Sequence, residues 1–187
     1  PAICRKSRYL LTNEDVIEVQ GPHTSGEVEI VALVDTDGIM ISVGSDHNDR
    51  SLANMWTESL GKIFDTAKSK QMCPAVVAKD AWKYEDVKSH WDSLKLRSYS
   101  TVSGRRIMFQ DFELSALVSL DHHLKNNNWL KEDGVVIFGG TSGMLPSVPL
   151  DLYPSDFHFE VHDPVLNRMI SHSYAVQSIE AADSLSL

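Results

Sequence analysis

Hydrophobic and polar residues alternate along several short stretches of this chain, with the period of two that is typical of β-strands. From residue 27 to residue 34 both sets of alternate positions become apolar, which predicts a strand that is buried on both faces. Asp37 and Gly38 follow as a turn signal, and residues 39–43 supply an apolar returning strand. Together these stretches predict a β-hairpin.

Further strands and helices are predicted downstream. Strands are expected at 75–78, on both sides of a turn at Ser103 and Gly104, at 135–138, and as a pair at 157–162 and 169–176. Helices are expected from a cap at Asp49 or Ser51 to about Phe64, as short turns between Trp82 and Trp91, and as two pieces from about 112 to 130. Lys68 is placed in a loop after the first helix, and the polar tail 177–187 is predicted to be flexible.

The predicted strands outnumber the predicted helices, and they neither alternate as βαβ units nor form an internal repeat. This order predicts a strand-rich α+β fold. The chain has 187 residues, of which 42% are hydrophobic and 23% charged, as is ordinary for one soluble globular domain. We therefore treat residues 1–187 as a single domain.

The charge and the cysteines exclude several classes of protein. Lys and Arg total 17 against 26 Asp and Glu, giving a net charge of −9 that opposes binding to nucleic acid or to anionic membranes. The sequence contains neither an apolar run of membrane-spanning length nor a signal-peptide pattern, so we expect a cytoplasmic protein. Cys4 and Cys73 have no paired spacing, which argues against a disulfide scaffold or a thiolate zinc site.

Two carboxylates are the most informative candidate chemistry. Glu27 and Glu29 are two residues apart on the predicted strand, so they project from the same face and could share one cation. If the strand is buried, two ionised carboxylates need a positive partner, and a hard divalent ion would serve. Asp46, at the end of the returning strand, offers a third oxygen ligand. The alternative is a solvated strand end without a ligand.

The segment 45–50 joins the predicted hairpin to the predicted helix. Asp49 has an alternative role as the helix cap, and His47 is either a base or a turn residue. Arg50 lies in the first helical turn, where a cation is unfavourable unless an anion lies beside it. Its position therefore indicates an anionic ligand.

Two later segments could also bind an anion. Lys68 is either a solvated cation near a helix end or an electrostatic clamp on a carboxylate or enolate. The glycine-rich loop GGTSG, residues 139–143, offers backbone N–H groups and the hydroxyl of Thr141, or it is a plain turn. Neither a phosphate-binding Walker motif nor a GxSxG nucleophile motif is present in the sequence.

The order of these blocks resembles the fumarylacetoacetate hydrolase superfamily along nearly the whole chain. The blocks are GEVEIVALV, GSDHNDR, AKSKQMCP, LKLRSYSTVSGRR, DGVVIFGGTSG and FHFEVHDPVLNRMISHSY. AKSKQMCP and FEVHDPVLNR resemble more closely an uncharacterised branch of the superfamily, a domain of unknown function. The resemblance implies the mixed β-roll of the fumarylacetoacetate hydrolase C-terminal domain and, because the superfamily is commonly dimeric, a homodimer.

The resemblance also implies a site and a type of reaction. It implies Mg²⁺ or Mn²⁺, with Ca²⁺ as a further option, bound by Glu27, Glu29 and Asp46. The candidate catalytic residues are Lys68, Arg50 and His47, and the candidate substrate-binding residues are Thr141, Gly140 and Ser69. Relatives hydrolyse, decarboxylate or isomerise small keto acids such as acylpyruvates and β-diketo acids through a metal-bound enolate. We therefore expect a metal-dependent enzyme that acts on a small keto acid.

Some residues depart from the superfamily pattern. Ser45, Ser51 and Ser142 stand where relatives usually have Asn, Asp and Pro. The catalytic His and Glu of relatives precede the E-x-E strand, whereas the stretch before Glu27 offers only His23 and no H-x-x-E. Either an N-terminal segment is absent from this chain, or this branch performs different chemistry. The alternative function is a non-catalytic module that retains the fold and binds a small carboxylate.

Overall fold

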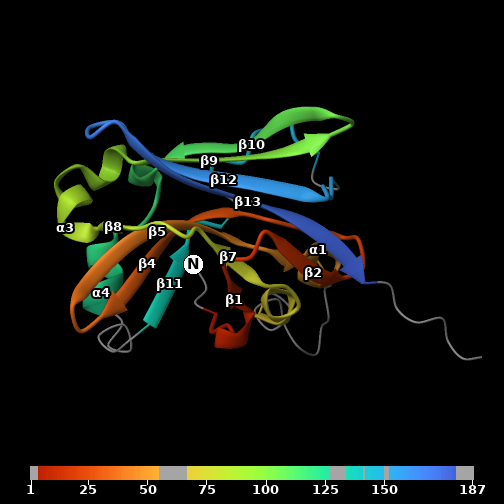
Figure 1. Cartoon of the computed structure of the whole chain (residues 1–187), viewed down its shortest axis with the longest axis horizontal. Helices are drawn as coiled ribbons and strands as arrows, with labels where there is room; N and C mark the ends of the chain where they lie inside the picture. The colour runs from red at the N-terminus through yellow and green to blue at the C-terminus, as the bar shows by residue number, and fades with distance from the viewer. Residues whose placement is uncertain (1–3, 55–66, 127–133, 141, 150–151, 180–187) are drawn as a thin grey trace, which may run out of the picture.

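The computed structural model describes residues 4–54, 67–126, 134–140, 142–149 and 152–179, and its longer strands form two mixed sheets that lie as two layers (Figure 1). The first sheet contains, in order, β1 (Leu11–Thr12), β7 (Ala75–Val77), β5 (Gly38–Asp46), β4 (Val28–Asp35) and β11 (Gly134–Phe138), with β8 (Trp82–Lys83) also paired to β5. The second contains β10 (Arg105–Glu113), β9 (Lys95–Val102), β12 (Asp156–Asp163), β13 (Arg168–Ile179) and β2 (Val16–Gln20). A short pair, β3 (Thr24–Ser25) and β6 (Asn48–Asp49), stands beside them.

The helical segments are short. They are η1 (Arg8–Leu10), α1 (Arg50–Asn54), residues 67–71, α3 (Tyr84–Val87), η2 (Lys88–Ser93), η3 (Leu114–Ala116) and α4 (Leu120–Asn126). Among the described residues no helix has the length and apolar character needed to span a bilayer. The strand-rich α+β class predicted from the sequence is confirmed.

The hydrophobic core lies between the two layers. It is built from alternate residues of β4 and β5, which pack against alternate residues of β12, β13 and β2. These residues include Val28, Ile30, Ala32, Ile41, Val43, Phe157, Phe159, Val161, Ile170, Ile17 and Val19. Because side chains alternate along a strand, the residues between them point away from the second sheet. The odd-numbered positions of β4 therefore face the opposite side of the first sheet.

The hairpin of β4 and β5 fixes which residues lie opposite each other. Asp35 pairs with Gly38, and the Asp35 carboxylate accepts hydrogen bonds from the backbone N–H groups of Asp37 and Gly38 at 2.8 and 3.1 Å. Pairing continues without a shift to Val28 and Ser45. A slip of one residue would turn every side chain of one strand to the other face, so this short turn determines the register of the whole hairpin.

Most predicted elements are present, including the turn at Ser103 and Gly104 and the final strand pair. Asp49 caps α1 as predicted, since its Oδ1 accepts the N–H of Leu52 at 2.9 Å. Residues 55–66 of the predicted first helix lie outside the described residues.

Three local predictions are wrong. Lys68 lies in the helical segment 67–71 and not in a loop. Phe112 and Glu113 belong to β10, where pairing with β9 overrides their placement in a helix. Residues 177–179 of the predicted tail extend β13 and pair with β2, a parallel strand that the sequence pattern did not indicate. In the last two cases pairing with another strand determines the local structure.

Candidate functional site

Three buried carboxylates meet on the face of the first sheet that points away from the second sheet. Glu27, Glu29 and Asp46 are 4%, 4% and 7% exposed, and each offers an oxygen atom within 4.8 Å of the others. The hairpin register explains the cluster, because the backbone N–H of Asp46 donates to the carbonyl of Glu27 at 3.1 Å. Directly opposite residues share a face of a sheet, so the third acid lies beside the first two.

Glu27 and Glu29 each have one carboxylate oxygen that accepts a hydrogen bond from a fixed donor. Arg50 donates to Oε1 of Glu27 at 2.7 Å and to the hydroxyl of Ser25. The backbone N–H of Gly140 donates to Oε1 of Glu29 at 2.8 Å. Partners of this kind orient ligating carboxylates in metal sites. A bound cation would use the second oxygen of each of these two carboxylates as a ligand atom.

The third carboxylate is bracketed by two lysines. Lys6 donates to Oδ1 of Asp46 at 3.0 Å, and Lys70, from the helical segment 67–71, binds Oδ2. The ammonium group of Lys70 also lies 4.0 Å from Oε2 of Glu27. With Arg50 on Glu27, three cationic side chains surround three carboxylates.

Burial and charge move the pKa values of these groups in different directions. Burial and the neighbouring charge of Asp46 raise the pKa of Glu29 to about 8, despite the nearby ammonium group of Lys70. Burial also raises the pKa of Asp46, but the ammonium groups of Lys6 and Lys70 outweigh it and hold that pKa below its ordinary value. Glu29 is therefore the carboxyl group of the cluster whose negative charge is least compensated by nearby cations.

The donor set fits a hard divalent cation. All three ligands are carboxylate oxygens, which Mg²⁺, Mn²⁺ and Ca²⁺ favour over nitrogen or sulfur ligands. Two of the carboxylates are already oriented by hydrogen bonds, and the raised pKa of Glu29 indicates that it would gain from a nearby cation. The residues predicted from the sequence as metal ligands are thus brought together in a suitable form.

His47 directly follows β5, and its side chain points into the core, away from the carboxylates. The imidazole of His47 is 2.8 Å from the hydroxyl of Tyr174 and 2.9 Å from that of Thr24. Burial, with the nearby cations Arg50 and Lys6, lowers its pKa to about 3. Because both ring nitrogens have partners in the core, this environment favours a structural role and not the predicted role as a base.

The glycine-rich loop reaches Glu29 because two of its residues adopt positive φ. Gly139 and Gly140 have φ of 151° and 63°, and a Cβ atom on Gly139 would lie 3.3 Å from the Cα of Glu29. The loop can therefore approach the carboxylate closely enough for its backbone N–H to donate. This places the predicted binding residue Gly140 at the cluster, whereas Thr141 lies outside the described residues.

A buried glutamine ties this loop to the strand that carries the acids. The side-chain oxygen of Gln110, on β10, accepts the N–H of Val28 at 2.8 Å, and its nitrogen donates to the carbonyls of Gly140 and Ser142 at 3.0 Å each. Gln110 is 1% exposed and also accepts the hydroxyl of Ser98. The side-chain amide thus fixes the distance between the Glu27–Glu29 segment and the loop.

The helical segment 67–71 presents its residues differently from the sequence-based prediction. Lys68 is exposed, Ser69 is buried, and it is Lys70 whose ammonium group lies among the carboxylates. Lys6, Lys70 and Gln110 were not predicted as site residues. Their contacts span 40, 24 and 82 residues of sequence, so neither local spacing nor periodicity signals them.

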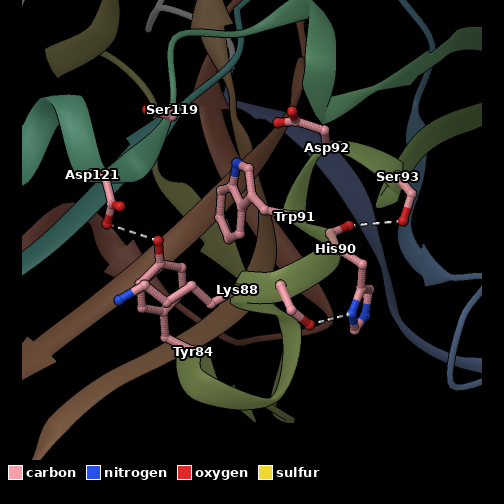
Figure 2. Close-up of a pocket in the computed structure, with 9 residues that line it drawn as sticks. Tyr84, Lys88, His90, Trp91, Asp92, Ser93, Ser119 and Asp121 are labelled. Atoms are coloured by element: carbon pink, nitrogen blue, oxygen red, sulfur yellow. Dashed lines mark hydrogen bonds between the residues drawn. The ribbon is translucent and has the colours of Figure 1, made fainter.

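A separate cavity of about 350 Å³ lies beside α3 and η2, and none of the three carboxylates lines it. Figure 2 shows Trp91 at its centre and the phenol of Tyr84 directed at Asp121, to which it donates at 2.9 Å. The Ser93 hydroxyl donates to the carbonyl of His90 at 2.7 Å. Because these lining groups bind each other and do not form a convergent set, we place the candidate site at the carboxylate cluster.

Comparison with solved structures identifies the fold. The chain matches 2-keto-3-deoxyarabinonate dehydratase with a TM-score of 0.67 at 13% identity, over 94% of this chain and 61% of that one. It matches Cg1458, solved with an inhibitor, with a TM-score of 0.61 at 15% identity, over 91% and 64%. It matches yeast ynq8, a fumarylacetoacetate hydrolase family protein, with a TM-score of 0.62 at 15% identity, over 91% and 74%.

The fold is therefore that of the fumarylacetoacetate hydrolase superfamily, as the sequence blocks predicted. The chain spans less than two thirds of the first two of these proteins. A search of curated proteins found no match to the sequence. The chain belongs to the family described as protein of unknown function (DUF2848), whose profile matches residues 1–174.

We expect Gln110→Met to destabilise the protein by about 1–3 kcal/mol, because the buried N–H of Val28 would lose its acceptor. Ser98→Ala is the matched control, since it removes only a second donor to the same oxygen. Urea unfolding followed by circular dichroism measures both. Equal losses in the two variants would contradict the role given to Gln110.

We expect Glu29 to make the metal-free protein less stable as the pH rises. Its folded pKa of about 8 exceeds the ordinary value of 4.5, so between these values the unfolded chain releases a proton that the folded protein retains. The free energy of unfolding should therefore fall with pH in this window. Denaturation in EDTA across pH 5–8 measures the slope.

Glu29→Gln is the control for this pH dependence, because an amide does not titrate. Histidines 47, 123 and 158 have lowered pKa values and contribute a slope of opposite sign, so the difference between wild type and variant is the relevant quantity. The same slope in both proteins would show that Glu29 is ionised throughout the window.

Proposed function

We propose that this protein is a divalent-metal-dependent enzyme that acts on a small keto acid, with Mg²⁺ or Mn²⁺ as the metal. The observation that carries the proposal is the buried carboxylate cluster of Glu27, Glu29 and Asp46, surrounded by cationic side chains. Buried carboxylates repel each other, and such a cluster is more economical in a site that holds a cation than in a plain core.

The cation would be held by the three carboxylates and would supply Lewis-acid polarisation of a substrate oxygen. The remaining functions fall to side chains and backbone groups of the chain. Lys70 offers an ammonium group to negative charge that develops on the substrate, and its pKa is raised, because the charges of Asp46, Glu29 and Glu27 outweigh the effect of burial. Arg50 and the Gly140 N–H keep two of the carboxylates in position.

The class of substrate follows from this distribution of charge and from the structural relatives. A keto acid presents a carboxylate and an adjacent keto oxygen, which suit a cation together with ammonium groups. One protein of the same fold is a dehydratase of 2-keto-3-deoxyarabinonate, and another is described as a fumarylacetoacetate hydrolase family protein. These names support small keto acids, including acylpyruvates, β-diketo acids and keto sugar acids, as the substrates to test.

The proposal is tested by titrating the protein with Mn²⁺ in a calorimeter and then assaying the loaded protein against these keto acids. We expect one Mn²⁺ site that is lost in Glu27→Gln, together with turnover of at least one keto acid. Glu18→Gln is the matched control, because Glu18 is an exposed glutamate on β2. Mn²⁺ binding that is the same in both variants would refute the metal site.

One observation favours a second candidate function. His47 is enclosed in the core with partners on both ring nitrogens. Among the described residues before Glu27, His23 is the only histidine, and it binds Ser51 at the surface. A protein without a base would bind a small carboxylate on its metal without converting it. Tight binding of keto acids to the Mn²⁺-loaded protein, with every one recovered unchanged, would support this binding function over the enzyme.

The two lysines of the helical segment make a matched pair for testing catalysis. We expect Lys70→Met to lower kcat by about a hundredfold or more, since it removes charge from within the cluster. Lys68→Met should change kcat by no more than a few fold, because the side chain of Lys68 is exposed. Steady-state kinetics with Mn²⁺ measure both, and the reverse order would support Lys68, the lysine that the family resemblance implies.

A further inference from the structure

Two lysines from separate segments converge on one carboxylate of the cluster. Lys6 binds Oδ1 of Asp46 at 3.0 Å, and Lys70 binds Oδ2. Both oxygens of Asp46 therefore contact ammonium groups, whereas Glu27 and Glu29 each have one oxygen held by Arg50 or by the N–H of Gly140. A cation bound by Asp46 would compete with the two lysines for these oxygens and would be repelled by their charges.

Lys6 is held in place by a clamp on the residues that flank it. The side-chain oxygen of Gln71 accepts the N–H of Ser7 at 3.1 Å, and its nitrogen donates to the carbonyl of Arg5 at 2.6 Å. Gln71 follows Lys70 in the helical segment 67–71. The clamp therefore fixes the N-terminal segment to the same short helix that supplies the other lysine.

The cluster contains as many cationic side chains as carboxyl groups. Glu27, Glu29 and Asp46 contribute three negative charges when ionised, and Arg50, Lys70 and Lys6 contribute three positive ones. A divalent cation would leave an excess of two positive charges in a largely buried site. Because buried charge is costly unless it is paired, the metal-loaded site calls for a ligand with two negative charges.

We propose that Lys6 exchanges partners, binding Asp46 in the metal-free protein and a carboxylate of the substrate when a divalent cation occupies the cluster. This inference rests on the proposed function and narrows its substrate class to keto acids that carry two carboxylates. Lys6 suits the exchange because its flexible stem lets the ammonium group move while Gln71 holds the flanking backbone. Lys6 is then a specificity-determining residue.

The test compares Lys6→Met with Lys83→Met, which removes an exposed lysine on β8. Calorimetry measures the affinity for Mn²⁺ alone, and then the affinity of the Mn²⁺-loaded protein for 2-oxoglutarate, a dicarboxylate, and for 2-oxobutyrate, a monocarboxylate. We expect Lys6→Met to tighten Mn²⁺ binding and to weaken 2-oxoglutarate binding, each by about tenfold. Binding of 2-oxobutyrate should stay within a few fold, and Lys83→Met should behave as the wild type.

The expected changes in Mn²⁺ affinity and in 2-oxoglutarate affinity have opposite signs. General damage to the site would instead weaken the binding of both ligands. Mn²⁺ affinity that is unchanged or lower in Lys6→Met would overturn the exchange. Equal weakening of both keto acids, or a wild-type loaded protein that does not bind 2-oxoglutarate, would overturn the dicarboxylate class. Failure of the wild type to bind Mn²⁺, or binding that survives Glu27→Gln, would instead refute the metal site of the proposed function.

A second variant keeps the test decisive if Lys6→Met does not fold, which circular dichroism would show. Gln71→Leu removes both hydrogen bonds of the clamp and leaves every charge of the cluster in place. It should change the two affinities in the same opposite directions as Lys6→Met, by smaller factors. A Gln71→Leu protein with wild-type affinities would overturn the proposed function of the clamp and of the lysine that it positions.

Discussion

Three carboxyl groups with oxygen atoms held within 4.8 Å of one another, almost out of contact with water, are the constraint around which this structure is organised. Such a group can exist only if cations, hydrogen-bond donors or protons compensate it. The protein uses all three, in the form of Arg50 and two lysines, the N–H of Gly140, and the raised pKa of Glu29. These cations and the N–H donor come from four separate segments of the chain.

The β-hairpin brings the three acids together within a short segment of the chain. Because pairing runs from the turn at Asp35 and Gly38 without a shift, Asp46 arrives opposite Glu27. The same alternation directs Ser45 to the opposite face, where its hydroxyl is 2.8 Å from that of Tyr174 on the second sheet. One strand thus supplies an acid to the site and an anchor to the core from adjacent positions.

The sequence was sufficient to predict the fold class, the hairpin and the pair Glu27 and Glu29, because all of them follow from period-two alternation and turn residues. Asp46 was added from its place after the returning strand and from the family resemblance. The sequence was not sufficient for Lys6, Lys70 and Gln110, whose contacts join segments far apart in the chain. The sequence left His47 open as either a base or a turn residue, because only contacts with the distant residues Tyr174 and Thr24 hold its imidazole in the core.

The two faces of the first sheet have different roles, and this difference affects which residues of the protein could change during evolution. His47 binds both Thr24 and Tyr174 in the core, and Tyr174 lies on the second sheet, so a change at His47 would disturb contacts between the two layers. Lys6, by contrast, reaches Asp46 from the N-terminal segment, outside the sheet, and could vary without moving the strands. A gene duplicate could therefore alter this covering segment while inheriting the acid-bearing hairpin intact.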